Sequence, residues 1–272
     1  MFAEERRSSM LELLAQDGRI EVKEMAQRFG VSLDSIRRDL AALEEQGLLI
    51  KTHGGAVPNQ QVRQGPQPPE RRYGQPQSHE DAIAKHAAAF VKANDTVYIG
   101  GAGIQYGVLQ RIPESLPLTV VTNSIKIAET AQQRKECDVI LIGGKVRASG
   151  TIADPISSEW IKQFTIDIGF FTGGGITERG ISTGTSETAL FIRSAFEACR
   201  SRIVLAPHQK IGRDAFMLAV PIERAHLLIA DSGADPEALD LIKARGVKIE
   251  IADHPDGIEP PAGLDESRGK EQ

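Results

Sequence analysis

The stretch VKEMAQRFGVSLDSIRRDLAALEEQGLLIKTHGGAV, residues 22–57, predicts two short helices at a tight turn, followed by a small hairpin. Gly30 lies where the chain must turn, because glycine adopts positive φ without steric cost. Ser32 is a good N-cap for the second helix. Apolar residues then recur at spacings of four and three, which predicts the buried stripe of that helix: Ile36, Leu40 and Leu43.

Polar and basic side chains off this stripe are the candidate DNA contacts. Arg37 and Arg38 are adjacent, and a helix with one buried face and arginines beside it is suited to a DNA major groove. Lys51 adds a cation in the predicted wing, whereas Glu44 and Glu45 are expected to project elsewhere. The candidate DNA-binding residues are Ser32, Ser35, Arg37, Arg38, Lys51 and His53.

A set of short motifs occurs in the same stretch: Ser35-Ile36-Arg37-Arg38-Asp39-Leu40, Leu43-Glu44, Gly47 and Lys51-Thr52-His53-Gly54-Gly55-Ala56. These motifs resemble the DNA-binding domain of the DeoR/GlpR family, bacterial repressors of sugar metabolism. The resemblance implies an N-terminal winged helix-turn-helix of the all-α class. The family usually has Thr where this chain has Ser35 and Arg where it has Lys51, so a hydroxyl and a cation are kept.

The composition is that of a globular protein in a reducing compartment. The 272 residues could form one large domain or two smaller ones. The two cysteines, Cys137 and Cys199, are far apart in sequence, which argues against a disulfide framework or a cysteine zinc site. The sequence has no apolar run near the roughly 18 residues of a membrane span, and its N-terminus lacks a signal peptide's apolar core. We therefore expect a cytoplasmic protein without a membrane partner.

The acidic net charge of −5 predicts that the chain binds its operator as an oligomer. One DNA-binding head with few cations makes few phosphate contacts, so two heads are needed for useful affinity. The expected assembly on double-stranded DNA is a homodimer or homotetramer. His53 is compatible with a phosphate contact and equally with a structural role in the wing turn.

The chain is expected to have four parts. Residues 1–57 are the DNA-binding domain, and residues 58–78, rich in Pro, Gln and Gly, are a linker. In residues 79–253, short apolar strands alternate with helical segments, which predicts an α/β domain with a mostly parallel sheet covered on both faces. This domain is expected to bind an effector and to form the oligomer. Residues 254–272 are expected to be a disordered tail.

Glycine-rich and polar loops follow four of the predicted strands, which are residues 96–99, 118–122, 139–142 and 202–206. Ligands of open α/β sheets bind at the carboxyl ends of strands, and glycine amides with Ser, Thr, Lys and Arg suit an anion. Each loop alone is equally a tight turn, but together they predict a phosphate pocket. Its candidate residues are Gly101, Gly103, Thr122, Asn123, Ser124, Lys145, Arg147 and Lys210.

Thr122-Asn123-Ser124, Gly143-Gly144 with Arg147, Asp167 with Phe170, and Lys210 with Gly212 resemble the effector domain of the same family. The resemblance implies a fold similar to ribose-5-phosphate isomerase and CoA-transferase-like proteins, loops that bind a phosphorylated sugar or a related metabolite, and a role for Glu187. The chain departs from the family pattern at Gly100, Gly103, Ile104, Ile192 and Pro207, where carboxylate, hydroxyl or lysine groups are usual. We therefore expect a weakly held phosphosugar or another anion, such as a sugar acid.

The favoured function is a DNA-binding regulator, a repressor of a carbohydrate operon, without catalytic residues, metal or cofactor. One alternative is a sugar-phosphate isomerase-like or CoA-handling enzyme with an appended DNA-binding domain, although the loops lack a convincing acid–base pair. Another is a nucleotide-binding module built on Gly101, Gly103 and Gly107, but that spacing is one residue too long for the dinucleotide fingerprint.

Overall fold

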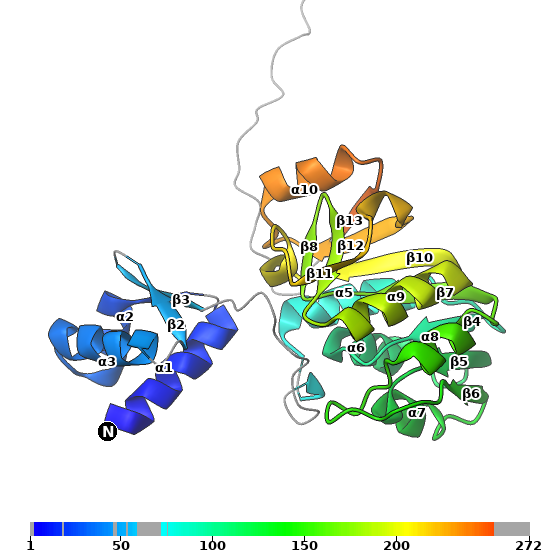
Figure 1. Ribbon diagram of the computed structural model, residues 1–272, viewed down its shortest axis with the longest axis horizontal. Helices are drawn as coiled ribbons and strands as arrows, with labels where there is room; N and C mark the ends of the chain where they lie inside the picture. Colours follow the sequence, from blue (N-terminus) through cyan, green and yellow to red (C-terminus); the bar gives the residue numbers. More distant parts are fainter. Residues whose placement is uncertain are drawn as a thin grey trace, which may run out of the picture. The chain divides into compact units, whose positions relative to one another are not determined.

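The computed structural model describes residues 3–17, 19–45, 48–52, 54–58, 72–74 and 76–252, and the chain divides into two compact units, residues 1–64 and 65–272 (Figure 1). The expected C′ glycine Gly47, the DNA-contact candidate His53, most of the predicted linker and the predicted tail lie outside the described residues.

The N-terminal unit is a winged helix-turn-helix, as the sequence predicts. Its elements in chain order are α1 (Ala3–Asp17), β1 (Ile20–Glu21), α2 (Val22–Phe29), α3 (Leu33–Glu45), β2 (Leu49–Lys51) and β3 (Gly55–Pro58). The wing is an antiparallel sheet in the order β1-β3-β2, so the short strand before α2 pairs with the hairpin.

The turn between α2 and α3 follows from local chemistry. Gly30 caps α2 in the left-handed conformation, with φ of 64°, which a β-carbon would make strained. Ser32 Oγ accepts a hydrogen bond of 3.2 Å from the Ser35 backbone N–H, so Ser32 caps α3. The core of the unit contains the predicted stripe together with apolar residues of α1 and α2, among them Met10, Leu14, Met25, Ile36, Leu40 and Leu43.

A buried ion pair joins α1 to α3. Asp39 is 2% exposed, and its carboxylate accepts hydrogen bonds from Arg6 Nε at 2.6 Å and Arg7 Nε at 2.9 Å. Buried charges are stable only when they are paired, so these contacts fix the position of α1 on α3.

The C-terminal unit is built on a parallel sheet of seven strands in the order β13-β12-β10-β7-β4-β5-β6. These strands are β4 (Thr96–Ile99), β5 (Leu118–Thr122), β6 (Cys137–Leu141), β7 (Ile166–Phe171), β10 (Cys199–Ala206), β12 (Leu227–Asp231) and β13 (Lys248–Ala252). The predicted α/β class and the mostly parallel sheet are therefore confirmed.

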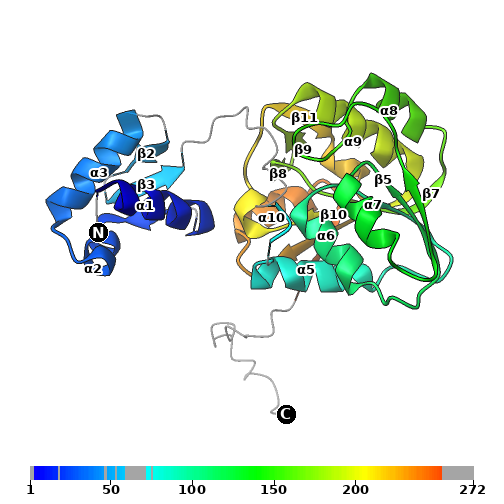
Figure 2. The same cartoon turned by 90° about the horizontal axis from the view of Figure 1, so that it is seen from below.

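Helices cover both faces of this sheet (Figures 1 and 2). One core joins the strands to α5 (Ser78–Ala88), α6 (Gly103–Arg111) and α7 (Ile125–Ala131). The other core joins them to α8 (Pro155–Ile161), α9 (Ser186–Ala198) and α10 (Pro236–Lys243). Neighbouring residues of a strand enter opposite cores, as Val97 and Tyr98 do, because side chains alternate across a strand.

The strand order reverses between β4 and β7, which are neighbours in the sheet although β5 and β6 separate them in sequence. Chains leaving these two strands turn in opposite directions, which opens a crevice outside their carboxyl ends. This crevice is the expected ligand position of a doubly wound sheet.

A second sheet, of antiparallel strands in the order β11-β9-β8, was not predicted from the sequence. It consists of β8 (Gly175–Thr177), β9 (Gly180–Thr183) and β11 (Met217–Val220). Two short 3₁₀ helices, η1 (His208–Lys210) and η2 (Ile222–Arg224), flank β11 in the chain.

Candidate functional site

Helix α3 presents two exposed arginines, the predicted DNA contacts Arg37 and Arg38. Arg37 Nη1 donates to Asp34 Oδ1 at 3.0 Å, and Arg38 Nε donates to the Asp34 carbonyl at 3.3 Å. The Arg37–Asp34 ion pair is 65% and 80% exposed at its two side chains, so it is weak and can exchange for a phosphate or a base. Ser35 lies at the start of the same helix, 3.0 Å from Ser32 between the hydroxyl oxygens.

The wing cation is less free than the sequence suggests. Lys51 Nζ forms an ion pair of 3.2 Å with Glu44, and the Lys51 backbone N–H donates to the same carboxylate at 2.9 Å. These hydrogen bonds lower the pKa of Glu44. The expectation that Glu44 projects elsewhere is therefore wrong, because the wing folds back toward the end of α3 and its lysine meets this glutamate.

The crevice between β4 and β7 is closed by a glutamine. Gln105, 5% exposed, donates from Nε2 to the Phe170 carbonyl at 2.6 Å and accepts from the Ala102 N–H at 2.9 Å. A β-carbon at Gly100 would lie 2.8 Å from Gln105 Nε2, so the glycine leaves room for this side chain. The sequence analysis did not single out Gln105.

Arg72 and Tyr73 also occupy this edge. Arg72 Nη1 donates to the Gly101 carbonyl at 2.8 Å and to the Ser149 carbonyl at 3.4 Å. The Tyr73 hydroxyl donates to the Gly101 carbonyl at 2.9 Å and lies 3.0 Å from Ser124 Oγ. We refer to Arg72 and Tyr73 as the strap.

The strap packs against Gly103, a position that from the sequence alone was expected only to lack a hydroxyl group. A β-carbon at Gly103 would lie 2.3 Å from the Arg72 carbonyl oxygen, a distance that a backbone contact does not tolerate. Tyr73 also packs edge-on against Tyr106 of α6, with ring centroids 5.3 Å apart. Both strap residues lie within the predicted linker. Tyr73 is the one aromatic residue of that linker, and it is the sequence feature that could have indicated a packed segment there.

The polar residues at the end of β5, Thr122, Asn123 and Ser124, are buried and form hydrogen bonds within the unit. Thr122 Oγ1 accepts from the Ser124 N–H at 3.1 Å, and Ser124 Oγ accepts from the Ile127 N–H at the start of α7. Asn123 accepts from the Tyr98 hydroxyl at 3.3 Å and donates to the Ile152 carbonyl at 2.7 Å. This network pins the loop after β6 onto the edge of the sheet.

Lys210 brings a cation to the same edge. Its ammonium group donates to Thr172 Oγ1, just after β7, at 3.3 Å. Burial lowers the pKa of Lys210, the Glu80 carboxylate acts in the opposite direction, and the Arg72 guanidinium lowers it further. Glu80 and Arg72 therefore lie close enough to Lys210 to affect its pKa.

The remaining candidates lie around this centre. Lys145 is exposed, and its backbone N–H donates to Asp154 at 2.5 Å. Arg147 donates to Thr188 Oγ1 at 3.1 Å at the start of α9, where Glu187 is also exposed. Arg147 thus ties the loop after β6 to α9.

The free space at this edge is small. A cavity of about 60 Å³ is lined by Arg72, Glu80, Gly103 and Tyr106, among others. Small-molecule sites are typically about 300–1,000 Å³, so this cavity is smaller than a usual ligand site. A hollow of about 350 Å³ near Thr165 and Cys199 lies at the amino ends of β7 and β10, the opposite edge from the one where such sheets bind ligands.

A winged helix-turn-helix joined to an α/β unit with a ligand crevice defines a sensor-controlled, DNA-binding transcriptional regulator. Residues 6–62 match the family model of the DeoR-like helix-turn-helix domain, and residues 76–232 match the DeoR C terminal sensor domain. The chain belongs to the DeoR family.

Relatives of known class agree with this membership. The HTH-type transcriptional repressor GlcR of Bacillus subtilis is 28% identical, over 94% of this chain and 99% of GlcR. The glycerol-3-phosphate regulon repressor of Escherichia coli is 26% identical, over 91% of this chain and 98% of the repressor. Ribose 5-phosphate isomerase A of Methanocaldococcus jannaschii matches with a TM-score of 0.36 and 15% identity, over 48% of this chain and 52% of the isomerase. Within the described residues, no helix is both long and apolar enough to cross a membrane.

Proposed function

We propose that this regulator represses a carbohydrate operon and that a small anionic metabolite in the β4–β7 crevice controls it. The observation that carries the proposal is the strap. Arg72 and Tyr73 belong to the segment of sequence that follows the DNA-binding unit, and they hydrogen bond to Gly101 and Ser124, two of the candidate effector residues. A ligand that competes for these groups acts directly on the chain that leads to the DNA-binding unit.

The charges at the crevice support an anionic effector. Arg72 and Lys210 lie at one edge of the sheet, and burial already lowers the pKa of Lys210. A buried cation is stabilised by an anion that reaches it, and a guanidinium suits a phosphate or carboxylate because its donors form a planar fork. A similar protein is named for a glycerol-3-phosphate regulon, which agrees with a phosphorylated or carboxylated polyol.

The proposed mechanism is a shift between two states. In one state the Tyr73 hydroxyl occupies Gly101 and Ser124, and in the other the effector does. Since the two states differ in where the segment before α5 is held, they differ in how two DNA-binding heads can be placed on half-sites. Coupling of this kind is typically worth about 5–150-fold in operator affinity.

We also propose where the chain acts and how it assembles. We place the chain in the cytoplasm as a homodimer or homotetramer, because the two exposed arginines of α3 make few phosphate contacts and a second head is needed for firm binding. We assign it no catalytic role. Light scattering at micromolar concentration, with and without operator DNA, tests the assembly, and a monomer in both conditions contradicts it.

The test of the effector site uses DNA selected from a random library by the protein itself. Operator binding is measured by fluorescence anisotropy while sugar phosphates, sugar acids and unphosphorylated sugars are added. The variant is Lys210→Met, and the matched control is Lys162→Met, whose ammonium pairs with Glu159 on the surface at 2.6 Å. We expect an anionic compound to change operator affinity in the wild type and in Lys162→Met, but not in Lys210→Met.

Two outcomes contradict the proposal. One is a full response of Lys210→Met at the wild-type effector concentration, which places the pocket elsewhere. The other is turnover of a sugar phosphate by the wild-type protein, abolished in Lys210→Met, which favours an isomerase-like enzyme.

A further inference from the structure

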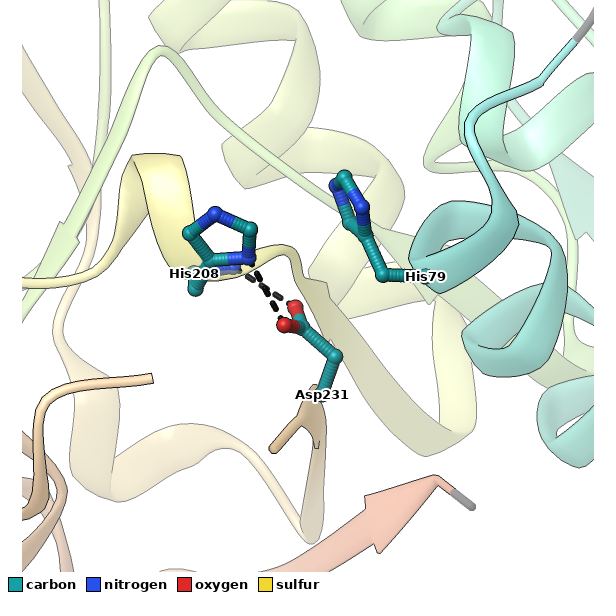
Figure 3. A group of neighbouring side chains, drawn as sticks. All are labelled: His79, His208 and Asp231. Carbon is teal, nitrogen blue, oxygen red and sulfur yellow. Dashed lines mark hydrogen bonds and ion pairs between the residues drawn. The ribbon is translucent and has the colours of Figure 1, made fainter. Parts of the chain in front are cut away.

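Two histidines and a buried aspartate converge beside the effector crevice (Figure 3). His79 is the second residue of α5, His208 is the first residue of η1 after β10, and Asp231 ends β12. The imidazole rings lie with their centroids 4.7 Å apart and their planes tilted by 53° to one another. One ligand atom from each of the three side chains lies within 4.8 Å of the other two. The sequence does not predict this cluster, because the two histidines lie 129 positions apart.

We propose that His79, His208 and Asp231 bind a divalent first-row transition metal, with zinc as the reference ion. Two imidazoles and one carboxylate are the donor set that such ions prefer, whereas Mg²⁺ and Ca²⁺ prefer oxygen. Three protein ligands leave one position for water or for an oxygen of a bound anion.

The geometry is close to that of a metal site. His208 Nδ1 lies 2.7 Å from Asp231 Oδ1. Ligand atoms about 2.0–2.2 Å from a tetrahedral zinc ion are about 3.3 Å apart, so this pair separates only slightly to admit an ion. His79 moves inward by at most about 1.5 Å, from the limit of 4.8 Å, by rotation of a side chain that is not fully buried.

The carboxylate is already held in place. Asp231 is 3% exposed, its Oδ2 accepts from the His208 backbone N–H at 2.8 Å, and its Oδ1 accepts from the Gly233 N–H at 3.0 Å. Hydrogen bonds of this kind orient a metal-binding carboxylate. Gly233 packs against the pair, since a β-carbon there would lie 3.0 Å from both Asp231 Oδ1 and His208 Nδ1.

Metal binding requires a simple exchange of protons and hydrogen bonds. A carboxylate oxygen only accepts, so His208 Nδ1 carries the proton in the bond to Asp231. Coordination through Nδ1 moves that proton to Nε2 by exchange with solvent, which the 35% exposed His208 side chain allows. His79 gives up its contact with Gln209, in which its Nε2 lies 3.1 Å from Oε1.

An ion in this position joins three elements around the effector edge. It fixes the start of α5, close in sequence to the strap, onto η1, which also carries Lys210. The inference does not depend on the effector assignment, because it needs only the His79, His208 and Asp231 geometry.

The test uses the full chain without a histidine tag, treated with chelator and then titrated with Zn²⁺ by calorimetry. Co²⁺ is added in a parallel experiment, because its visible absorption reports tetrahedral nitrogen and oxygen ligands. We expect one ion per chain, a higher melting temperature with Zn²⁺, and no effect of Mg²⁺. His79→Gln and His208→Gln should each lose more affinity than the roughly 10–100-fold that loss of an outer-shell partner costs.

Two control variants test whether other histidine or cysteine side chains bind the ion. His226→Gln removes an exposed histidine just before β12, and Cys137→Ser removes the more exposed thiol, and both should bind Zn²⁺ as the wild type does. Melting in chelator reports folding, and if His208→Gln melts early there, His79→Gln decides the result. The proposal is overturned if Zn²⁺ does not saturate at one site, or if the folded His79→Gln variant binds Zn²⁺ with wild-type affinity.

Discussion

Replacement of Asp39 by alanine should strongly destabilise the DNA-binding unit while leaving the stability of the sensor unit unchanged. The Asp39 side chain is 4% exposed, and its partner Arg6 is 10% exposed. Removing one member of a buried pair leaves the other charge desolvated, which costs about 3–5 kcal/mol. A unit of this size is stable by only about 3–9 kcal/mol, at roughly 0.05–0.15 kcal/mol per residue. The substitution therefore removes about one third of that stability or more.

Hydrogen exchange measured by mass spectrometry follows the two units separately. In Asp39→Ala, amides of α1 to α3 should exchange roughly 100-fold faster or more, as expected for a loss of about 3 kcal/mol at 1.4 kcal/mol per factor of ten. The matched control is Asp34→Ala on the same helix, where an 80% exposed carboxylate should contribute about 0.5 kcal/mol or less. Equal exchange in the Asp39 and Asp34 variants would refute the view that the buried pair holds α1 on α3.

Three further predictions concern the two sites. If Arg37 or Arg38 contacts a base, its replacement by alanine should cost about 1–3 kcal/mol of operator binding and alter the site preference. If the arginine contacts phosphate, the loss should be uniform across DNA sequences and the salt dependence shallower. Unchanged binding in both variants excludes this helix as the DNA-binding element. Tyr73→Phe removes two hydrogen bonds of about 0.5–1.5 kcal/mol each. The affinity for the effector, measured by calorimetry, should therefore rise roughly 5–100-fold. A fall in affinity contradicts the proposal that the strap competes with the effector. The pKa of Lys210 is lowered, so its positive charge is complete at low pH and is lost as the pH rises through that pKa. Affinity for an effector whose own charge is constant should therefore fall on the alkaline side. In Lys210→Arg, the affinity should not change with pH in this range.

The fold could be predicted because its signals are local and repeated. The stripe of Ile36, Leu40 and Leu43 at helical spacing, with Gly30 at the turn, specifies the second and third helices without reference to the rest of the chain. Continuous apolar strands between helices specify a parallel sheet in the same way. The small β8-β9-β11 sheet has no such signal, because its strands are short and β11 pairs with β9 across the whole of α9 and β10.

Contacts between charged groups were predicted less well, because they depend on positions far apart in the sequence. The pairing of Asp39 with Arg6 spans 33 positions, and no periodic pattern links them. Lys51 and Glu44 are closer, but only the path of the hairpin brings them together. A helical wheel gives the face of a residue, but it does not give the partner that another element supplies.

The first loop of the sensor unit shows why a departure from a family pattern need not mean a lost site. Glycine at 100 and at 103 replaces the carboxylate and hydroxyl groups that are usual in the family, so the sequence alone predicts a weakened pocket. In the structure, Gly100 leaves room for Gln105, and Gly103 leaves room for the Arg72 backbone. The chain thus places its own polar groups where a ligand is expected, and hydrogen-bond donors that the loop lacks are supplied by Arg72 and Tyr73. The two glycines and the strap are therefore complementary in shape, and the effector response proposed above depends on whether a ligand replaces the strap contacts.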